Sequence, residues 1–138
     1  MINEERELCV MESITAEELF FFDAKPGEFF LYEAFRKAVL DRIPETWIEV
    51  KKTQISFFNR YMFAAVSFAK VRRAKDRPDP FLTITFGLPY RKESPRIDVA
   101  VEAYSNRWTH HVMIGAEDEI NDELLSWIVE AAAFSAYK

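Results

Sequence analysis

Two stretches near the start of the chain have the hydrophobic pattern of helices. Thr15-Ala-Glu-Glu18 matches a capping box, in which hydroxyl and carboxylate each satisfy a free backbone N–H, and it predicts a short helix through about Phe22. A second helix is predicted to begin near Pro26, where a missing N–H has no cost, and to end before Pro44. Its apolar residues recur on one face of a 3.6-residue period, at Leu31, Ala34, Phe35, Ala38 and Val39.

From residue 46 onward apolar and polar residues alternate, which is typical of half-buried strands. The alternation predicts about five strands, over residues 46–57, 62–70, 82–86, 97–102 and 109–114, with a turn at 59–61. In the first strand the apolar positions change from even to odd numbers near Lys52, which indicates a β-bulge or a bend in the strand. A final helix is predicted from Glu117, because acids in its first turn suit the positive end of the helix dipole.

This order of elements predicts the fold class. Helices, then a run of strands, then a helix are typical of a two-layer α+β fold with an antiparallel sheet of about five strands in a meander. We expect the N-terminal helix pair and the C-terminal helix to pack on one face of that sheet. The 138 residues fit one domain, so we expect a flexible lead-in over 1–13 and a single α+β domain over 14–138.

The composition excludes several classes of function. The chain has three glycines, which are too far apart for a P-loop or a dinucleotide fingerprint. It has one cysteine, Cys9, and neither a Cys-x-x-Cys nor a His-Glu-x-x-His motif, so we expect no disulfide, no metal and no cofactor. The start of the chain is acidic and no apolar run approaches the roughly 20 residues that span a bilayer. We therefore expect a cytoplasmic protein without a membrane partner.

The net charge of −5 is unevenly distributed, because residues 50–97 are basic and lie between two acidic parts. In a meander alternate loops lie at the same end of the sheet, so two basic clusters are expected. One would join Arg72, Arg73, Lys75 and Arg77 of the 72–79 loop with Arg107, and the other Arg60 with Arg91, Lys92 and Arg96. The acidic balance of the whole chain argues against nucleic-acid binding, which usually needs a basic footprint overall.

The adjacent histidines His110 and His111 attract attention as candidate site residues. Neighbouring residues of a strand point to opposite faces, so one metal ion cannot easily bind both imidazoles. His110 is expected on the core side with a hydrogen-bond partner, because an unpaired buried group costs about 1–3 kcal/mol. Lys51 and Lys52 have two open interpretations, as edge-strand charges that discourage aggregation or as part of a binding site beside the bulge.

Short motifs spread over residues 31–137 resemble a known family. They are Leu31-Tyr-Glu-Ala-Phe35, Lys52-Thr-Gln-Ile-Ser-Phe57, Phe63-Ala64, Arg96-Ile97, Arg107-Trp-Thr-His-His111, Asp122-Glu-Leu-Leu-Ser-Trp-Ile128 and Ala136-Tyr137. They resemble an uncharacterised bacterial family of domains of unknown function. That family has no established activity, so the resemblance implies no catalytic residue. It draws attention to Lys52, Phe57, Arg96, Trp108 and His111, the positions that match its pattern.

The favoured interpretation is a non-catalytic module that binds a small ligand or a protein through the open face or an edge of its sheet. A second copy of the chain is one candidate partner. The candidate ligand-binding residues are Lys52, Arg96, Trp108 and His111, with no catalytic residue and no metal ligand. The alternative is a small enzyme or anion-binding protein that uses His111, Lys52 and Arg96, and the third is a nucleic-acid accessory domain acting through the basic 70–77 loop.

Overall fold

A computed structural model describes residues 14–137, and the two predicted N-terminal helices are present in it. Helix α2 spans Ala16–Phe21 and α3 spans Pro26–Arg42. The predicted capping box is confirmed: Glu18 N–H donates to Thr15 Oγ1 at 3.1 Å, and Thr15 N–H donates to Glu18 Oε1 at 3.0 Å. Pro26 is at the first helical position, as predicted. The expected flexible lead-in over 1–13 lies outside the described residues.

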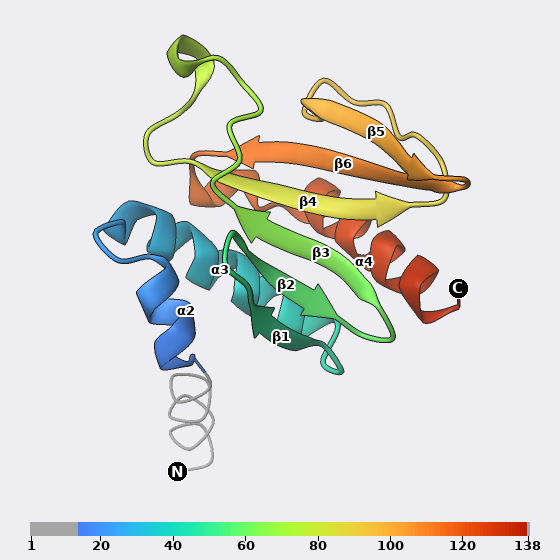
Figure 1. Ribbon diagram of the computed structural model, residues 1–138, viewed down its shortest axis with the longest axis horizontal. Helices are drawn as coiled ribbons and strands as arrows, with labels where there is room; N and C mark the ends of the chain where they lie inside the picture. The colour runs from blue at the N-terminus through green and yellow to red at the C-terminus, as the bar shows by residue number, and fades with distance from the viewer. Residues whose placement is uncertain (1–13, 138) are drawn as a thin grey trace.

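A six-stranded antiparallel sheet forms the centre of the molecule (Figure 1), with the order β1-β2-β3-β4-β6-β5. Its strands are β1 (Trp47–Val50), β2 (Gln54–Phe58), β3 (Met62–Ser67), β4 (Leu82–Leu88), β5 (Val99–Tyr104) and β6 (Arg107–Ile114). Every neighbouring pair is antiparallel. The predicted α+β class with an antiparallel sheet is confirmed, with six strands in place of about five.

The prediction of one strand with a β-bulge or bend near Lys52 is wrong, because the chain reverses there and forms two strands. Strand β1 ends at Val50 and runs antiparallel to β2, with Val50 opposite Ile55. Lys51 N–H donates to the carbonyl of Gln54 at 2.8 Å and closes the turn. The apolar positions change from even to odd because two strands of a hairpin meet here, each with its own alternation. A register shift does occur in this hairpin region, but between Phe57 and Phe58.

The last two strands depart from a simple meander. After β4 the chain crosses the sheet through residues 89–98, adds β5 at the outer edge, and returns as β6 between β4 and β5. The crossover exchanges one member of each predicted basic cluster, Arg107 and Arg96, between the two ends of the sheet. Arg107, at the start of β6, lies at the sheet end of the 59–61 turn with Arg60, whereas Arg96 lies at the end where β6 leads into residues 119–123.

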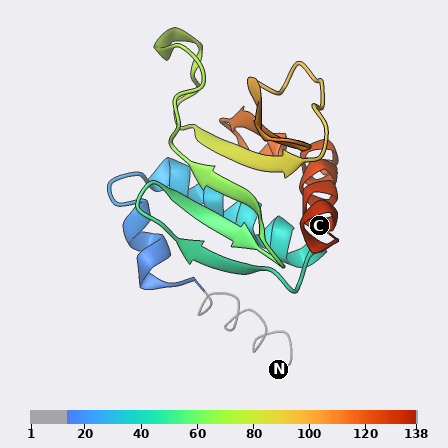
Figure 2. The ribbon, with the colours of Figure 1, turned by 45° about the vertical axis from the view of Figure 1, so that its right-hand side comes forward.

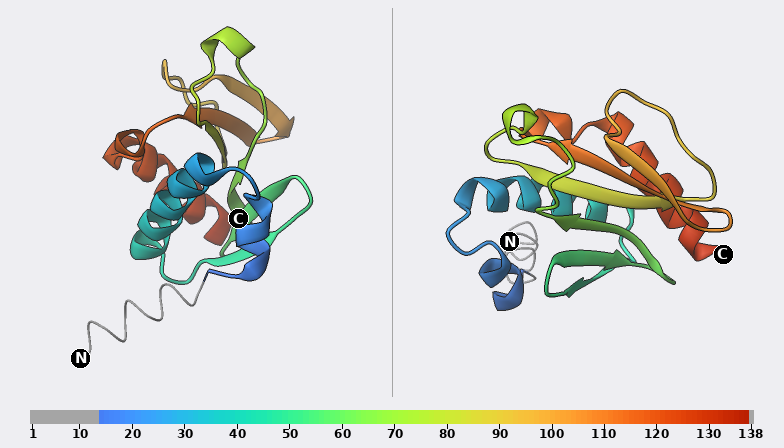
Figure 3. Two further views of the ribbon diagram at one scale, coloured as in Figure 1. Left: turned by 90° about the vertical axis from the view of Figure 1, so that its left-hand side faces the viewer. Right: turned by 45° about the horizontal axis from the view of Figure 1, so that its top comes forward.

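Two helices, α3 and α4 (Asp122–Ala136), cover one face of the sheet, as Figures 2 and 3 show. Helix α2 stands beside β1 at the edge of the sheet. Residues Glu117–Glu119 form a separate 3₁₀ turn, and α4 begins after Asn121, whose side chain accepts from Leu124 N–H at 3.1 Å. The predicted start at Glu117 is therefore wrong, because an Asn side chain satisfies the free N–H at the true N-cap.

The core between the helices and the sheet is rich in aromatic side chains. Tyr32, Phe35, Phe57, Phe63 and Phe86 are fully buried. Phe35 meets Phe57 edge to face, with ring centroids 5.6 Å apart. Such pairs contribute about 0.5–1.5 kcal/mol beyond the burial of their area. The rigid core holds the sheet in place and leaves its opposite face without a covering helix in the described part of the chain.

Candidate functional site

The uncovered face of the sheet carries a large hollow. We call it the open-face groove; its volume is about 1260 Å³. It is lined by residues of α2, of β1 and the β1–β2 turn, of strands β2, β3, β4 and β6, and of the segment that follows β3. They are Ala16, Glu17, Phe20, Phe21, Val50, Lys51, Lys52, Thr53, Gln54, Met62, Ser67, Phe68, Ala69, Thr85, Thr109 and His111.

One wall of the open-face groove is apolar and comes from two segments far apart in the sequence. Phe21 of α2 stacks on Phe68, which follows β3, with ring centroids 5.2 Å apart. Phe20, also of α2, is 78% exposed beside them, and Val50 and Met62 extend the apolar surface toward the sheet. An exposed phenylalanine next to a hollow offers apolar area that a ligand can cover.

The position of this wall depends on a buried ion pair beneath α2. Glu18 accepts from Arg36 Nε at 2.7 Å and from the hydroxyl of Tyr32, and it also takes part in the capping box of Thr15. Burial alone raises the pKa of Glu18, but the hydrogen bonds from Arg36, Tyr32 and the backbone of Thr15 lower it below its usual value. The charged carboxylate thus fixes α2 to α3, and with it Phe20 and Phe21.

The floor of the groove is a polar row that crosses the sheet. Ser56, Thr85 and His111 occupy successive positions of β2, β4 and β6, with Ala65 of β3 between the first two. Thr85 Oγ1 and His111 Nδ1 are hydrogen-bonded at 2.8 Å. Gln54 Nε2 donates to Ser56 Oγ at 2.8 Å. Gln54, Thr85 and His111 line the groove below the apolar wall, whereas Ser56 is buried beneath them.

His111 is neutral in this environment. Burial lowers its pKa below the usual value, because a charged imidazole is poorly solvated there. Its Nδ1 is engaged by Thr85, which leaves Nε2 without a hydrogen bond to the described residues. A neutral imidazole with one engaged nitrogen can exchange one further hydrogen bond with a polar group in the groove.

Positive charge lies at the rim, in the turn between β1 and β2. Lys51 Nζ pairs with Glu49 at 3.0 Å. The ammonium group of Lys52 has no ion pair among the described residues and is exposed beside the groove. Glu17 of α2 also contributes to the lining. The rim can therefore offer one unpaired cation to an acidic group.

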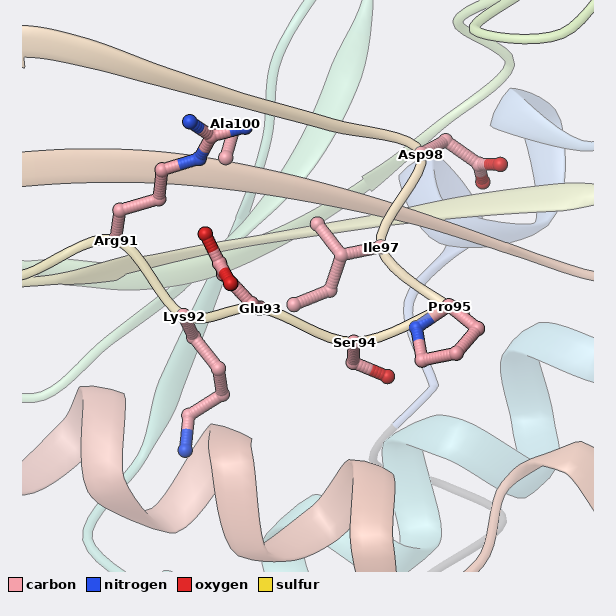
Figure 4. Close-up of a pocket in the computed structure, with 8 residues that line it drawn as sticks. All are labelled: Arg91, Lys92, Glu93, Ser94, Pro95, Ile97, Asp98 and Ala100. Carbon is pink, nitrogen blue, oxygen red and sulfur yellow. The ribbon is translucent and has the colours of Figure 1, made fainter.

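A second, smaller hollow of about 470 Å³ lies between the crossover and β5 (Figure 4). Charges of both signs line it. Lys92 Nζ pairs with Glu130 of α4 at 3.2 Å, and Asp98 with Arg72 at 2.8 Å. These ion pairs engage two of its four charged residues, Lys92 and Asp98, and the hollow has little apolar lining. The larger open-face groove, with an apolar wall and convergent polar groups, is the better candidate site.

The structure brings together two of the four predicted site residues. Lys52 and His111 both line the open-face groove. Arg96 lies on the helix-covered side, where it donates to Asn121 Oδ1, to Glu123 and to the carbonyl of Glu119 at 2.6–3.0 Å. Trp108 pairs with Leu88 and lies on the His110 side of β6, away from the groove. A single site of His111, Lys52 and Arg96 is therefore not supported by this placement.

His110 points into the core, as the alternation predicts. Its ring stacks on Phe86 with centroids 4.9 Å apart, and its Nε2 accepts from the N–H of Lys92 in the crossover at 2.9 Å. The expected hydrogen-bond partner is thus confirmed for one ring nitrogen. Nδ1 is buried and has no hydrogen-bond partner among the described residues. The nearby backbones of Phe86 and Trp108 raise the pKa of the ring, but burial lowers it by more.

Sequence reasoning missed the groove residues Phe20, Phe68, Gln54 and Thr85. The strands did show small polar side chains at alternate positions, which was the available signal. These side chains come together only through strand pairing, which brings Thr85 to His111, 26 positions further along the chain. Within residues 14–137, no group of three or more His, Cys, Asp or Glu residues could hold a metal ion, and no helix has the length and apolar character to cross a bilayer.

The fold and the groove define the class of this protein: a small α+β protein built on an antiparallel sheet with helices on one face and a hollow on the other. The model of a family described as a domain of unknown function (DUF5655) matches residues 23–135, and the chain belongs to that family. This confirms the resemblance noted in the sequence. Comparison with curated proteins and with solved structures gives no significant match.

Proposed function

We propose that the protein is a non-catalytic binding module whose open-face groove takes up a small amphipathic ligand with an apolar body and one acidic group. The observation that carries the proposal is the combination of an exposed aromatic wall, a neutral His111 and an unpaired Lys52 around one hollow. Ligand sites are typically concave and mostly apolar, with a few convergent polar groups that fix orientation.

The apolar wall and the charged rim are different parts of the groove, so together they orient the ligand. Its apolar body covers Phe20, Phe68 and Met62, and burial of apolar area supplies most of the affinity, at roughly 25 cal/mol per Å². Its acidic group lies near Lys52. An exposed ion pair contributes only about 0–1 kcal/mol, so Lys52 determines which end of the ligand faces outward more than how tightly it binds.

The polar pair in the floor supports binding better than catalysis. Thr85 and His111 are within hydrogen-bond distance, which is a requirement for an activated nucleophile. A third group normally orients the histidine, and within the described residues His111 makes no hydrogen bond to a carboxylate. The pair therefore acts as a hydrogen-bonding site for a polar atom of the ligand.

The proposal is tested with 1-anilinonaphthalene-8-sulfonate, an aromatic anion that fluoresces when its apolar rings leave water. We expect saturable binding to the full chain. Phe20→Ala removes exposed apolar area, so it should weaken binding about 5- to 30-fold, which corresponds to about 1–2 kcal/mol. Lys52→Glu should weaken it by up to about 10-fold, because attraction becomes repulsion at the rim.

Two variants serve as matched controls. Phe30→Ala removes a phenylalanine that is 55% exposed on α3, outside the groove. Lys75→Glu reverses the charge of a lysine in the 3₁₀ turn between β3 and β4, also outside the groove. Both should leave the affinity unchanged. The proposal fails if the dye does not bind saturably, or if the control variants weaken binding as much as the groove variants.

The nucleic-acid interpretation receives less support from the 70–77 segment. Arg72 is paired with Asp98 at 2.8 Å and Arg73 with Asp76 at 3.5 Å, so two of its arginines are engaged within the protein. Nucleic-acid affinity that relies on phosphate contacts needs several free cations. We expect no gel shift of single-stranded DNA even at low salt.

A further inference from the structure

Strand β5 leaves an apolar edge of the sheet uncovered. It is the last strand in the sheet order and pairs only with β6. Its sequence, Val-Ala-Val-Glu-Ala-Tyr, has one charged residue, Glu102, and Val101 is 53% exposed. Such an edge presents a row of backbone groups to any strand that approaches, and proteins usually protect it.

The opposite edge of the same sheet is protected. Strand β1 carries Glu49, which pairs with Lys51, and the turn after it adds Lys52. Helix α2 packs beside β1 as well. Charges and a covering helix are common means of preventing strand addition. The contrast between the two edges indicates that β5 has a partner strand.

We propose that β5 pairs in antiparallel fashion with β5 of a second copy of this chain, across a two-fold axis that joins the two sheets into one continuous sheet. An isologous contact needs a surface that is complementary to itself. A short strand of small and β-branched residues meets this requirement, provided that its single charge is accommodated. The position of that charge selects the register.

Every register centred on a residue of β5 keeps the helix-covered faces of both sheets on the same side, because directly opposite residues then point to the same face. We compare the three registers centred near the middle of the strand. Centred on Glu102, the pairing places two glutamates opposite each other. Centred on Ala100, it places Glu102 opposite Asp98. Centred on Val101, it places Val101 opposite Val101 of the partner subunit and Glu102 opposite a small apolar residue, Ala100. Like charges directly opposite are destabilising, so the register centred on Val101 is favoured.

Arg91 gives this register its charge complement. Arg91 and Ala100 line the same hollow, and Figure 4 shows the guanidinium of Arg91 reaching toward Ala100. Arg91 has no ion pair among the described residues. Since Glu102 of one copy faces Ala100 of the other, it also meets Arg91 of that copy. The two-fold axis repeats this ion pair, so the dimer contains it twice.

The size of the contact sets the expected affinity. Two six-residue strands bury less surface than a standard interface, so the dimer belongs to the weak class below about 1,200 Å². We expect a dissociation constant of about 10 μM to 1 mM. Sedimentation velocity over a concentration series that spans this range should show a monomer converting to a dimer.

The test uses charge at the centre of the register. Val101→Lys places two ammonium groups opposite each other and should weaken dimerisation at least 10-fold. Val129→Lys changes a valine that is 41% exposed on α4 and should have no effect. Circular dichroism and thermal unfolding verify that both variants fold. A strict monomer at the highest concentration overturns the proposal, as does a dimer that Val101→Lys leaves intact.

A charge exchange tests the register itself. Glu102→Arg places a guanidinium beside Arg91 of the other copy and should weaken the dimer. Arg91→Glu should weaken it in the same way, because two glutamates then meet. The double variant restores opposite charges and should recover the wild-type affinity. Failure of the double variant to recover it, while both single variants weaken the dimer, overturns this register.

Discussion

The imidazole of His110 lies in an apolar row of the core, beside Phe86, with Nε2 held by the backbone N–H of Lys92. Burial is the largest cause that lowers its pKa, and the positive charge of Lys92 lowers it further, although the nearby backbones of Phe86 and Trp108 raise it. The folded protein therefore keeps His110 neutral at pH values where an exposed histidine is protonated.

This difference predicts how stability depends on pH. Below the usual histidine pKa of about 6.5 the unfolded chain binds a proton that the folded chain does not, so stability decreases as the pH falls. For one fully neutral histidine the loss approaches about 1.4 kcal/mol per pH unit. Urea unfolding at about pH 7.5 and about pH 5.5 should show this loss in the wild type and a smaller one in His110→Phe. Equal losses in both proteins would contradict the prediction.

At the scale of the element, α2 is held by one carboxylate. Glu18→Gln removes the charge of one half of the buried Arg36–Glu18 ion pair, so we expect a loss of about 3–5 kcal/mol in the free energy of unfolding. Glu17→Gln, on the same helix but exposed, is the control and should cost less than about 0.5 kcal/mol. Chemical denaturation measures both, and similar losses for the two variants would rule out the anchoring role.

The same carboxylate adds an acid-dependent contribution. Because the pKa of Glu18 is lowered in the folded protein, its stabilising effect is fully present above the pKa of an unfolded glutamate. It is lost as the pH falls through the lowered value. The wild type should therefore lose more stability than Glu18→Gln on acidification below about pH 4.5.

The crossover, residues 89–98, is held by Arg96. Its guanidinium makes hydrogen bonds to Asn121, Glu123 and the carbonyl of Glu119, and it lies over the ring of Trp127. Arg96→Met keeps much of the volume but removes these bonds, so we expect a loss of about 1.5–3 kcal/mol. Arg91→Met, in the same segment but without an ion pair in the described chain, should cost less than about 0.5 kcal/mol. Thermal unfolding of the two variants gives the comparison.

At the scale of the whole molecule, the groove and the β5 edge are separate surfaces. The groove is formed by α2, by β1 with the turn after it, and by β2, β3, β4 and β6, whereas the edge is formed by β5 with Arg91 of the crossover. Val101→Lys should therefore leave the dye affinity within about 2-fold of the wild type, because it changes no groove residue. Phe20→Ala should leave dimerisation unchanged. An effect of either variant on both measurements would show that the two surfaces are coupled.

The family match begins at residue 23, after α2. Phe20 and Phe21, which form much of the apolar wall, therefore lie outside the matched region. The floor of the groove, with Gln54, Thr85 and His111, lies inside it. The polar floor and Phe68 therefore lie within the matched region, and the segment that precedes it contributes Phe20 and Phe21 to the aromatic wall.

The sequence by itself determined the features that depend on neighbouring residues. The capping box at Thr15, the start of α3 at Pro26 and the alternating residues of β4 were all predicted, because each rests on backbone hydrogen bonds or periodicity within a few positions. The α+β class followed from the order of these elements. The core position of His110 followed from alternation alone.

Only the tertiary structure decided which strands are neighbours. The turn at Lys52 and the insertion of β6 between β4 and β5 are choices among pairings of similar local pattern, and long-range packing selects one of them. Those choices bring Lys52 and His111 to one groove and carry Arg96 to the opposite face. Lys52, Arg96 and His111 belong to one sequence pattern, but a pattern along the chain does not say on which face of the sheet each side chain will lie.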